Sequence, residues 1–174
     1  NIYGTLNLLE AATDYWQGLS SQKSNEFLYH HISTDEVFGS LAKNGEFSEI
    51  SKYQPKSPYS ASKASCDHFV RAWINTYGLP SIITNCSNNF GPWQIPEKLI
   101  PLTIYKCLNR QNIPIYGNGL NIRDWIFIDD HIEALIKCAF NAKVGETYCI
   151  GGENQLTNMS VVKIFPKCLV VGQS

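Results

Sequence analysis

The sequence predicts an α/β fold with parallel strands. Apolar runs of strand length alternate with helical patterns along the chain, and this alternation is typical of a parallel sheet covered by helices. A hydrophobic content of 44% is enough for a core, and a length of 174 residues favours one domain. The net charge of −1 gives no electrostatic reason to expect nucleic acid or membrane surfaces as partners. No apolar run approaches the ~20 residues of a membrane span.

Local patterns predict each element in turn. The chain opens on a helical pattern over 1–17, and an apolar run predicts a strand over 27–33. A helix over 58–77 begins at Pro58, which suits a first turn, and stops before Gly78. The remaining expected elements are strand 80–86, helix 96–110, strand 113–116, a short strand at 125–128, helix 129–141, strand 146–150 and a helix from about 158 that Pro166 interrupts.

Tyr59 and Lys63 are four residues apart on the expected helix, so their side chains share one face and can meet. A nearby ammonium favours the ionised phenol and lowers the pKa of the tyrosine from ~10 towards a range useful for a base. Such a pair suits removal of a proton from a sugar hydroxyl while hydride leaves the same carbon. The alternative is an ordinary amphipathic helix with a packed tyrosine and a surface lysine.

The polar tetrad Ser33-Thr34-Asp35-Glu36 ends the strand expected at 27–33. Functional residues of parallel sheets collect at the carboxyl ends of strands, which favours a site here. The alternative is a helix-capping box, with Ser33 as the cap and Glu36 three residues later. Gly39 and the loop-like stretch after it leave little room for that helix.

A dinucleotide-binding fold needs a glycine-rich turn after its first strand, where backbone N–H groups approach the pyrophosphate. This sequence contains no such motif. Gly117 and Gly119 begin a similar string, but Ile122 stands where the third glycine is needed.

Three motifs resemble those of the extended short-chain dehydrogenase/reductase family: S-T-D-E-V-F-G, S-P-Y-S-A-S-K-A-S and T-N-C-S-N-N-F-G-P. Within that family the chain is most similar to the dTDP-glucose 4,6-dehydratase branch, from Asn1 to about Val162. The segments P-E-K-L-I-P, P-I-Y-G-N-G, I-R-D-W and G-E-T-Y-C-I-G-G strengthen the likeness. The adjacent Asp-Glu is its most specific element, because epimerases of the family typically lack the pair. UDP-glucuronate decarboxylases and GDP-mannose dehydratases usually keep only the glutamate.

The resemblance implies a partial Rossmann-like, doubly wound parallel sheet that lacks its N-terminal glycine-rich half. It also implies part of a small substrate-binding domain. Residues 1–116 would be the C-terminal part of an NAD-binding domain and would carry the catalytic residues. Residues 117–174 would be mainly an incomplete substrate-binding part, with some return to the first domain. In the family the helix expected at 1–17 follows the first strands, so the chain resembles an internal fragment of a longer enzyme.

The implied reaction is oxidation of a nucleotide sugar at C4, elimination of water across C5 and C6, and return of hydride from NADH to C6. By resemblance Glu36 is the base, Asp35 the acid and Thr34 a hydrogen-bond donor to the C4 oxygen. Neighbouring carboxyls in different environments can have different pKa values and divide such roles.

The resemblance also implies the site residues. Those expected at the cofactor are Ser33, Tyr59, Lys63 and Asn89. Those expected at the substrate are Thr34, Asn88, Lys98, Leu99, Pro114, Ile115, Tyr116, Arg123 and Asn158. Lys98 and Arg123 are the candidates for a diphosphate, because ammonium and guanidinium donors fit phosphate oxygens. The alternative for both is a solvated surface cation, and the Asn88-Asn89 pair could equally be a simple turn.

Other polar groups have plainer explanations. Asp129-Asp130-His131 resembles a metal site but fits a helix start with acids in its first turn, so no metal is expected. His30 and His31 point to opposite strand faces. The six cysteines show no C-x-x-C spacing, which favours free thiols in a reducing compartment, and we expect a cytoplasmic protein.

The family resemblance further implies a homodimer through helices 1–17 and 58–77. Two other functions stay open: a non-catalytic sugar-nucleotide-binding or scaffold fragment, and a UDP-hexose dehydratase or epimerase. No residue decides between a dTDP and a UDP base. Because the glycine-rich turn is missing, we expect residues 1–174 alone to be inactive.

Overall fold

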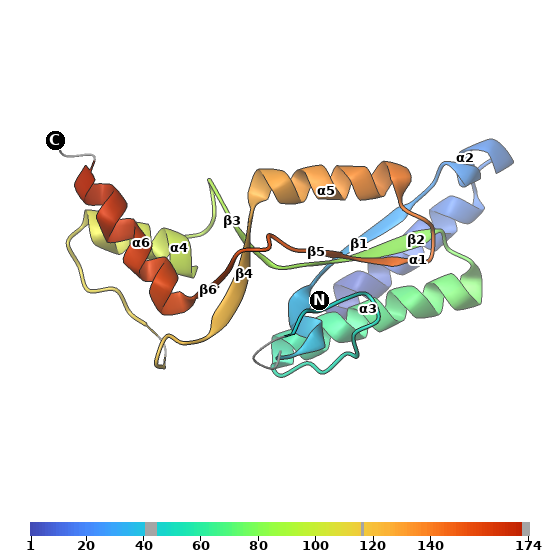
Figure 1. Ribbon diagram of the computed structural model, residues 1–174. Helices are drawn as coiled ribbons and strands as arrows, with labels where there is room; N and C mark the ends of the chain where they lie inside the picture. Colours follow the sequence, from blue (N-terminus) through green and yellow to red (C-terminus); the bar gives the residue numbers. More distant parts are fainter. Residues whose placement is uncertain (41–44, 116, 172–174) are drawn as a thin grey trace. The chain divides into compact units, whose positions relative to one another are not determined.

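The computed structural model describes residues 1–40, 45–115 and 117–171, which divide into two compact units (Figure 1). The first unit comprises Asn1–Cys86 and Glu133–Ile150, and the second comprises Ser87–Ile132 and Gly151–Ser174. The elements are α1 (Ile2–Gln17), α2 (Ser21–Asn25), β1 (Tyr29–Thr34), the 3-10 turn η1 (Asp35–Phe38), α3 (Pro58–Tyr77), β2 (Ser81–Cys86), β3 (Asn88–Phe90), α4 (Leu99–Leu108), β4 (Ile122–Phe127), α5 (Ile128–Asn141), β5 (Thr147–Ile150), β6 (Gln155–Thr157) and α6 (Asn158–Val171).

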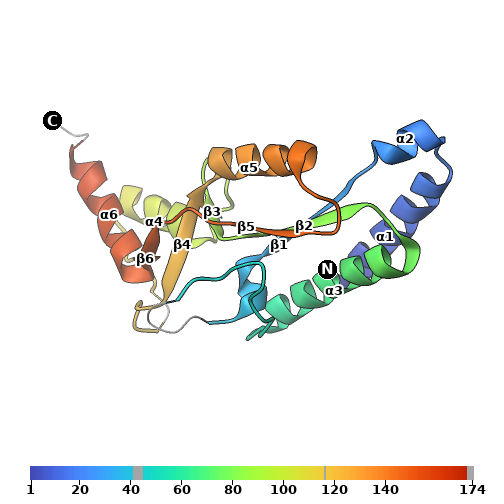
Figure 2. The same ribbon diagram turned by 45° about the vertical axis from the view of Figure 1, so that its right-hand side comes forward.

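The first unit is built on a parallel sheet of order β1-β2-β5. The central strand β2 is buried along its whole length, and in the register Ser33 pairs with Asn85. Both views place α1 and α3 on one face of this sheet and α5 on the other (Figures 1 and 2). Helices on both faces of parallel strands confirm the expected doubly wound α/β architecture.

Helix α3 covers the residues that the sequence predicted, because both of its ends are encoded locally. Ser57 and Ser60 form a capping box, and Pro58 occupies the first turn. At the other end Gly78 is left-handed, with φ of 72°, and its N–H bonds the carbonyl of Ile74. The helix therefore has a fixed start, and Tyr59 falls in its first turn.

Two buried clusters of the first unit include residues of α3. One cluster joins α1, α3 and β2 through the buried side chains of Leu9, Val70 and Ile83. A second holds η1 against α3 through Val37, Phe38 and Ala64. These two clusters pack α3 against β2 and against η1, which follows the carboxyl end of β1.

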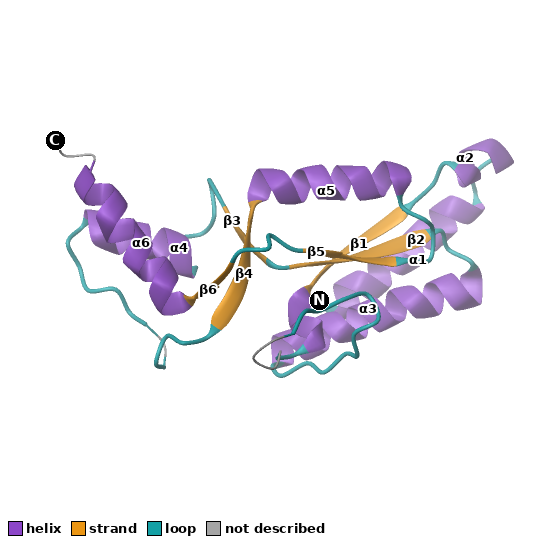
Figure 3. Ribbon diagram, in the orientation of Figure 1, coloured by secondary structure: helices purple, strands orange, loops and turns teal. Residues whose placement is uncertain are grey.

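The second unit contains a mixed sheet of order β3-β4-β6 (Figure 3). Strand β3 is parallel to β4, and β6 is antiparallel to β4. Ile100 of α4, Trp125 of β4 and Val161 of α6 form its core.

Several expectations differ from the structure. The sequence does not predict helix α2 or the short strands β3 and β6, because three- to five-residue elements carry almost no periodic signal. The expected strand at 113–116 is absent from its described part, residues 113–115, which has no regular structure. Helix α6 continues past Pro166 to Val171 although a proline removes one backbone donor.

The two compact units also have other bounds than the expected division after residue 116. The chain leaves the first unit after Cys86, because β3 pairs with β4 rather than with the first sheet, and it returns at Glu133. Residues Glu133–Ile150 are the part of 117–174 that lies in the first unit. Among the described helices, none is long and apolar enough to cross a bilayer.

Candidate active site

The acid pair lies on the 3-10 turn η1, which follows β1. Residues 34–38 are called the acid-pair turn below. Thr34 is its cap, and its Oγ1 accepts a hydrogen bond of 3.3 Å from the Glu36 N–H. Thr34 Oγ1 also donates to Asp35 Oδ1 at 3.3 Å. The capping-box alternative is therefore wrong in its details: Thr34 rather than Ser33 is the cap, and Gly39 ends the turn.

Gly39 is required where the turn ends. Its φ is 90°, and a Cβ there would collide with the backbone oxygen of Gln54. Gln54 in turn donates its N–H to the Val37 carbonyl at 2.9 Å. The segment before α3, which contains Gln54, therefore packs against the C-terminal end of the acid-pair turn.

Tyr59 and Lys63 lie one turn apart on α3, beside the acid-pair turn. Burial raises the pKa of the Tyr59 phenol, and the Glu36 carboxylate acts in the same direction. Cys86 and Asp35 make smaller contributions of the same sign.

This direction is opposite to the lowering that we expected from Lys63. The Lys63 ammonium instead donates to the backbone carbonyl of Ile32 at 2.8 Å. That carbonyl lies near the carboxyl end of β1 and offers the ammonium a fixed acceptor.

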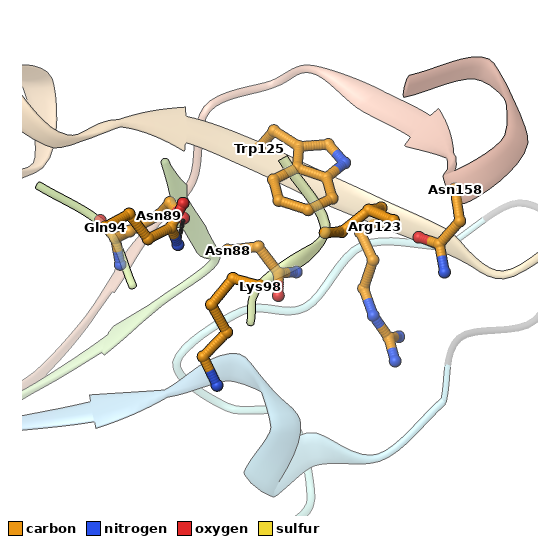
Figure 4. Close-up of a pocket in the computed structure, with 8 residues that line it drawn as sticks. Asn88, Asn89, Gln94, Lys98, Arg123, Trp125 and Asn158 are labelled. Carbon is orange, nitrogen blue, oxygen red and sulfur yellow. Dashed lines mark hydrogen bonds between the residues drawn. The ribbon is translucent and has the colours of Figure 1, made fainter. Parts of the chain in front are cut away.

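The second unit contains a polar pocket of about 200 Å³ (Figure 4). Strands β3 and β4, the starts of α4 and α6 and the segment before α4 supply its lining: Asn88, Asn89, Gln94, Lys98, Leu99, Arg123, Trp125 and Asn158. Figure 4 shows the Lys98 ammonium and the Arg123 guanidinium pointing the same way on the two sides of Asn88. This set is called the cationic pocket below.

The two cations of the cationic pocket are held loosely. Lys98 Nζ lies 3.6 Å from Glu97 Oε1, and both side chains are largely exposed. Arg123 is exposed on β4. Long exposed cations suit an anionic ligand that approaches from solvent, because their charges stay hydrated until the ligand replaces the water.

Backbone and amide contacts fix the floor of the cationic pocket. Asn88 donates to the Asp124 carbonyl at 3.4 Å, and Gln94 donates to the Asn89 carbonyl at 2.9 Å. The Asp124 carboxylate accepts the N–H groups of Gly152 and Asn154, each at 2.6 Å, which ties the loop before β6 to β4.

The structure brings most of the expected substrate residues together in the cationic pocket, along with the expected cofactor neighbour Asn89. The substrate residues found there are Asn88, Lys98, Leu99, Arg123 and Asn158. Thr34 belongs to the acid-pair turn instead. Pro114 and Ile115 do not line the pocket, and Tyr116 lies outside the described residues.

Gln94 and Trp125 line the pocket but were not among the residues expected there. Trp125 follows Arg123 by two residues on β4, so strand periodicity places both on one face and could have found it. Its indole nitrogen is buried without a hydrogen-bond partner among the described residues. Gln94 lies in an irregular segment and carries no comparable signal.

Asp129 and Asp130 occupy the first turn of α5, as the capping interpretation expected. His131 is buried there, and burial lowers the pKa of its imidazole. No group of three potential metal ligands occurs within residues 1–40, 45–115 and 117–171. The cysteines whose side chains the structure describes, all but Cys168, form no disulfide bond.

Known proteins are similar to this chain over most of its length. A dTDP-glucose 4,6-dehydratase of Neisseria meningitidis serogroup B is 57% identical over 164 residues, which cover 94% of this chain and 46% of the relative. The chain therefore spans about half the length of that relative.

Two solved structures share the fold. The dTDP-glucose 4,6-dehydratase of Bacillus anthracis, solved in complex with NAD, is 43% identical with a TM-score of 0.88, covering 99% of this chain and 52% of that one. The UDP-glucuronic acid 4-epimerase of Bacillus cereus, in complex with UDP-glucuronic acid and NAD, is 28% identical with a TM-score of 0.84, covering 99% of this chain and 52% of that one. The similarity to dTDP-glucose 4,6-dehydratases expected from the motifs is confirmed.

The family model described as GDP-mannose 4,6 dehydratase matches residues 1–170, nearly the whole sequence. It covers the acid-pair turn, Tyr59 and Lys63, and all residues of the cationic pocket. The chain belongs to the GDP-mannose 4,6 dehydratase family.

Proposed function

We propose that the protein bearing this sequence is an NAD-dependent lyase that converts dTDP-glucose to dTDP-4-keto-6-deoxyglucose. The observation that supports this most is the adjacent pair Asp35 and Glu36 on one short turn beside Tyr59, close enough for both carboxylates to raise the pKa of its phenol. A 4-epimerase needs only proton and hydride transfer at C4, whereas a 4,6-dehydratase also removes a proton from C5 and a hydroxyl from C6. Two carboxyls supply a base and an acid for that elimination.

The residues present fit the nicotinamide end of NAD. The Lys63 ammonium lies at the carboxyl end of β1, and Tyr59 is half exposed beside it on the same helix. We propose that both hold the nicotinamide ribose, with Ser33 and Asn89 as further neighbours. NAD would accept hydride from C4 and return it to C6.

The residues of this chain would divide the remaining work. In its ionised form Tyr59 would take the proton of the C4 hydroxyl, and Lys63 would supply a cation one turn along the same helix. Thr34 would donate to the C4 oxygen. Glu36 would remove the C5 proton and return a proton to C5 when hydride adds to C6, and Asp35 would protonate the departing C6 hydroxyl.

The cationic pocket would hold the diphosphate of a nucleotide sugar through Lys98 and Arg123. Its small volume and two exposed cations suit a diphosphate better than an uncharged sugar. Asn88 and Asn158 add amide donors, and Leu99 supplies an apolar contact. The remaining proposed substrate contacts are Pro114, Ile115 and Tyr116.

The test offers dTDP-glucose and UDP-glucose to the intact protein with NAD and follows the alkali-induced absorbance of a 4-keto-6-deoxy sugar. The proposal expects that product from dTDP-glucose at a kcat/KM about tenfold or more above that from UDP-glucose, a modest discrimination for one pocket. A C4 epimer from a UDP-sugar would instead support the second candidate, which the likeness to the UDP-glucuronic acid 4-epimerase favours. Binding of the nucleotide sugar without any product would support a scaffold.

The division of labour between the units is a further part of the proposal. The first unit would belong to the NAD-binding domain and the second to the substrate-binding part.

Cysteines that form no disulfide bond favour a cytoplasmic location, because a reducing compartment keeps their thiols from being oxidised.

The assembly is proposed to be a homodimer through α1 and α3. The exposed apolar side chains of Tyr3, Leu8 and Tyr15 on α1 support it. The large apolar residues of α3 support it less, because Phe69 and Trp73 pack on the core of the first unit. Sedimentation of the intact protein at micromolar concentration tests the dimer, and a monomer there would contradict it.

A further inference from the structure

A polar stripe runs along the face of α3 that meets the sheet. Tyr59, Lys63, Asp67 and Arg71 follow one another at intervals of four residues, so they form one row on the helix. The proposed reaction uses the first two residues of this row. It leaves unexplained why a fully buried carboxylate, Asp67, follows them.

Asp67 is held by side chains from three other segments. The Tyr53 hydroxyl donates to Asp67 Oδ2 at 2.7 Å, and the Asn85 amide donates to the same oxygen at 3.1 Å. His31 Nε2 lies 3.2 Å from Oδ1. Burial alone would raise the pKa of this carboxyl, but hydrogen bonds from His31, Ser33, Tyr53 and Asn85 outweigh it and hold the pKa below its usual range. Asp67 is therefore an acceptor, not a proton source.

Asn85 connects this carboxylate to the start of the acid-pair turn. Its Nδ2 also donates to the Thr34 carbonyl at 3.1 Å, so one amide group bridges Thr34 and Asp67. Asn85 is buried in the central strand β2, where its position is set by pairing with Ser33 of β1. Rotation of the Thr34 peptide would break this bridge.

Tyr53 connects the same carboxylate to the end of the acid-pair turn. Its ring packs edge-on against Phe38, and its neighbour Gln54 donates to the Val37 carbonyl. Arg71 fixes Tyr53 from the other side, with its guanidinium 4.8 Å from the ring centroid and a 3.0 Å hydrogen bond to the hydroxyl. Both ends of the turn are thus linked to one oxygen, Asp67 Oδ2.

We propose that Asp67, through Asn85 and Tyr53, is a positioning residue that fixes the acid pair relative to Tyr59 and Lys63 on the same helix. The inference rests on the proposed function, because it assigns the network to the elimination step. The Tyr53 hydroxyl and the Asn85 amide nitrogen hold the turn through hydrogen bonds that are shielded from water. A displacement of about 1 Å in a catalytic group costs about 100-fold in rate. A loosened acid pair would slow elimination without weakening substrate binding.

The test compares Tyr53→Phe, Asn85→Ala and the double variant in the intact protein, with Tyr105→Phe as a matched control on an exposed tyrosine of α4. The measured quantities are KM and the single-turnover rate constant for elimination, which does not depend on how much of the protein is folded. We expect each single variant to slow elimination about tenfold or more with KM within about twofold. The double variant should slow elimination by less than the product of the two single-variant factors, because both side chains act through one oxygen.

Asp67→Asn provides a conservative rescue. An amide oxygen in the place of Oδ2 still accepts from Tyr53 and Asn85, so Asp67→Asn should retain much more of the elimination rate than Asp67→Ala. Wild-type elimination rates in both Tyr53→Phe and Asn85→Ala would overturn the inference, whatever happens to the melting temperature.

Hydrogen exchange of residues 34–38 gives a readout that does not depend on activity. We expect the Glu36 amide, bonded to Thr34, to exchange about tenfold faster or more in Tyr53→Phe and Asn85→Ala than in the wild type. If the wild-type protein forms no 4-keto-6-deoxy sugar, the proposed function fails, and exchange alone decides the network. Unchanged protection of this amide would then overturn it.

Discussion

The acid-pair turn and the cationic pocket hold their functional groups in opposite ways. Around the turn, buried side chains converge on Asp67, and Thr34 caps the turn through its own hydroxyl. In the pocket, Lys98 and Arg123 reach outward from short elements, and the amides beneath them are tied to backbone carbonyls. Chemistry that moves protons needs fixed geometry, whereas capture of an anion needs charge within reach.

The two regions should therefore respond differently to mutation. Changes at the acid-pair turn should alter rate constants, and changes at the cationic pocket should alter binding.

The largest expected effect is the complete loss of turnover when residues 1–174 are expressed alone. The chain has no glycine-rich turn to hold a pyrophosphate, so Tyr59 and Lys63 would hold only the nicotinamide ribose. We expect weak or absent NAD binding by calorimetry and no alkali-induced absorbance with dTDP-glucose. Turnover by this chain would show that the turn is dispensable.

Asp35→Asn should come next. If Asp35 is the acid, the intact protein should still oxidise C4 but eliminate water about 10²–10⁴-fold more slowly, the usual contribution of general acid catalysis. Reduced cofactor should accumulate in a single turnover, which absorbance at the nicotinamide band measures. The matched control is Asp130→Asn, which changes an exposed acid at the start of α5 and should leave the rate unaltered. An unchanged elimination rate in Asp35→Asn would contradict the assignment.

Arg123→Met should raise KM for the nucleotide sugar about 10–100-fold with little change in kcat, because one charge-assisted hydrogen bond contributes about 1.5–3 kcal/mol. Lys98→Met should have a smaller effect, since Lys98 already shares its charge with Glu97. Steady-state kinetics over a range of dTDP-glucose concentrations measures both. Arg110→Met, at an exposed position after α4, is the control. A fall in kcat at constant KM in Arg123→Met would contradict the expectation that the cationic pocket acts on binding rather than on rate.

Ser57→Ala should have the smallest effect, a loss of about 1 kcal/mol in the free energy of unfolding, because it removes the cap of α3. Ser65→Ala is a matched control in the middle of the same helix, where the Ser65 hydroxyl donates to the Ala61 carbonyl. That change should be neutral or slightly stabilising, since alanine is the better helix former. Denaturant titration measures both. Equal losses would mean that α3 is positioned by packing alone.

Local sequence patterns predict the bounds of an element correctly where the element carries its own start and stop signals. The capping box at Ser57 and the glycine at Gly78 encode the bounds of α3, and the first helix and β2 were found within one residue. The motif spacing alone placed Tyr59 beside Lys63 and the acid pair after β1. Short strands such as β3 and β6 depend on hydrogen bonding to β4, so no local pattern predicts them.

The sequence by itself determined the chemical groups of the candidate site: two adjacent acids, a tyrosine and lysine one helical turn apart, and two cations suited to a diphosphate. These depend on residue type and on spacing along one element. Only the tertiary structure decided that Tyr53, Asp67 and Asn85 meet, because they come from a loop, a helix and a strand that are distant in sequence. It also decided the direction of the Tyr59 pKa, which depends on burial and on the Glu36 carboxylate rather than on helical spacing. Long-range burial is set by packing of the whole unit, and no local pattern encodes it.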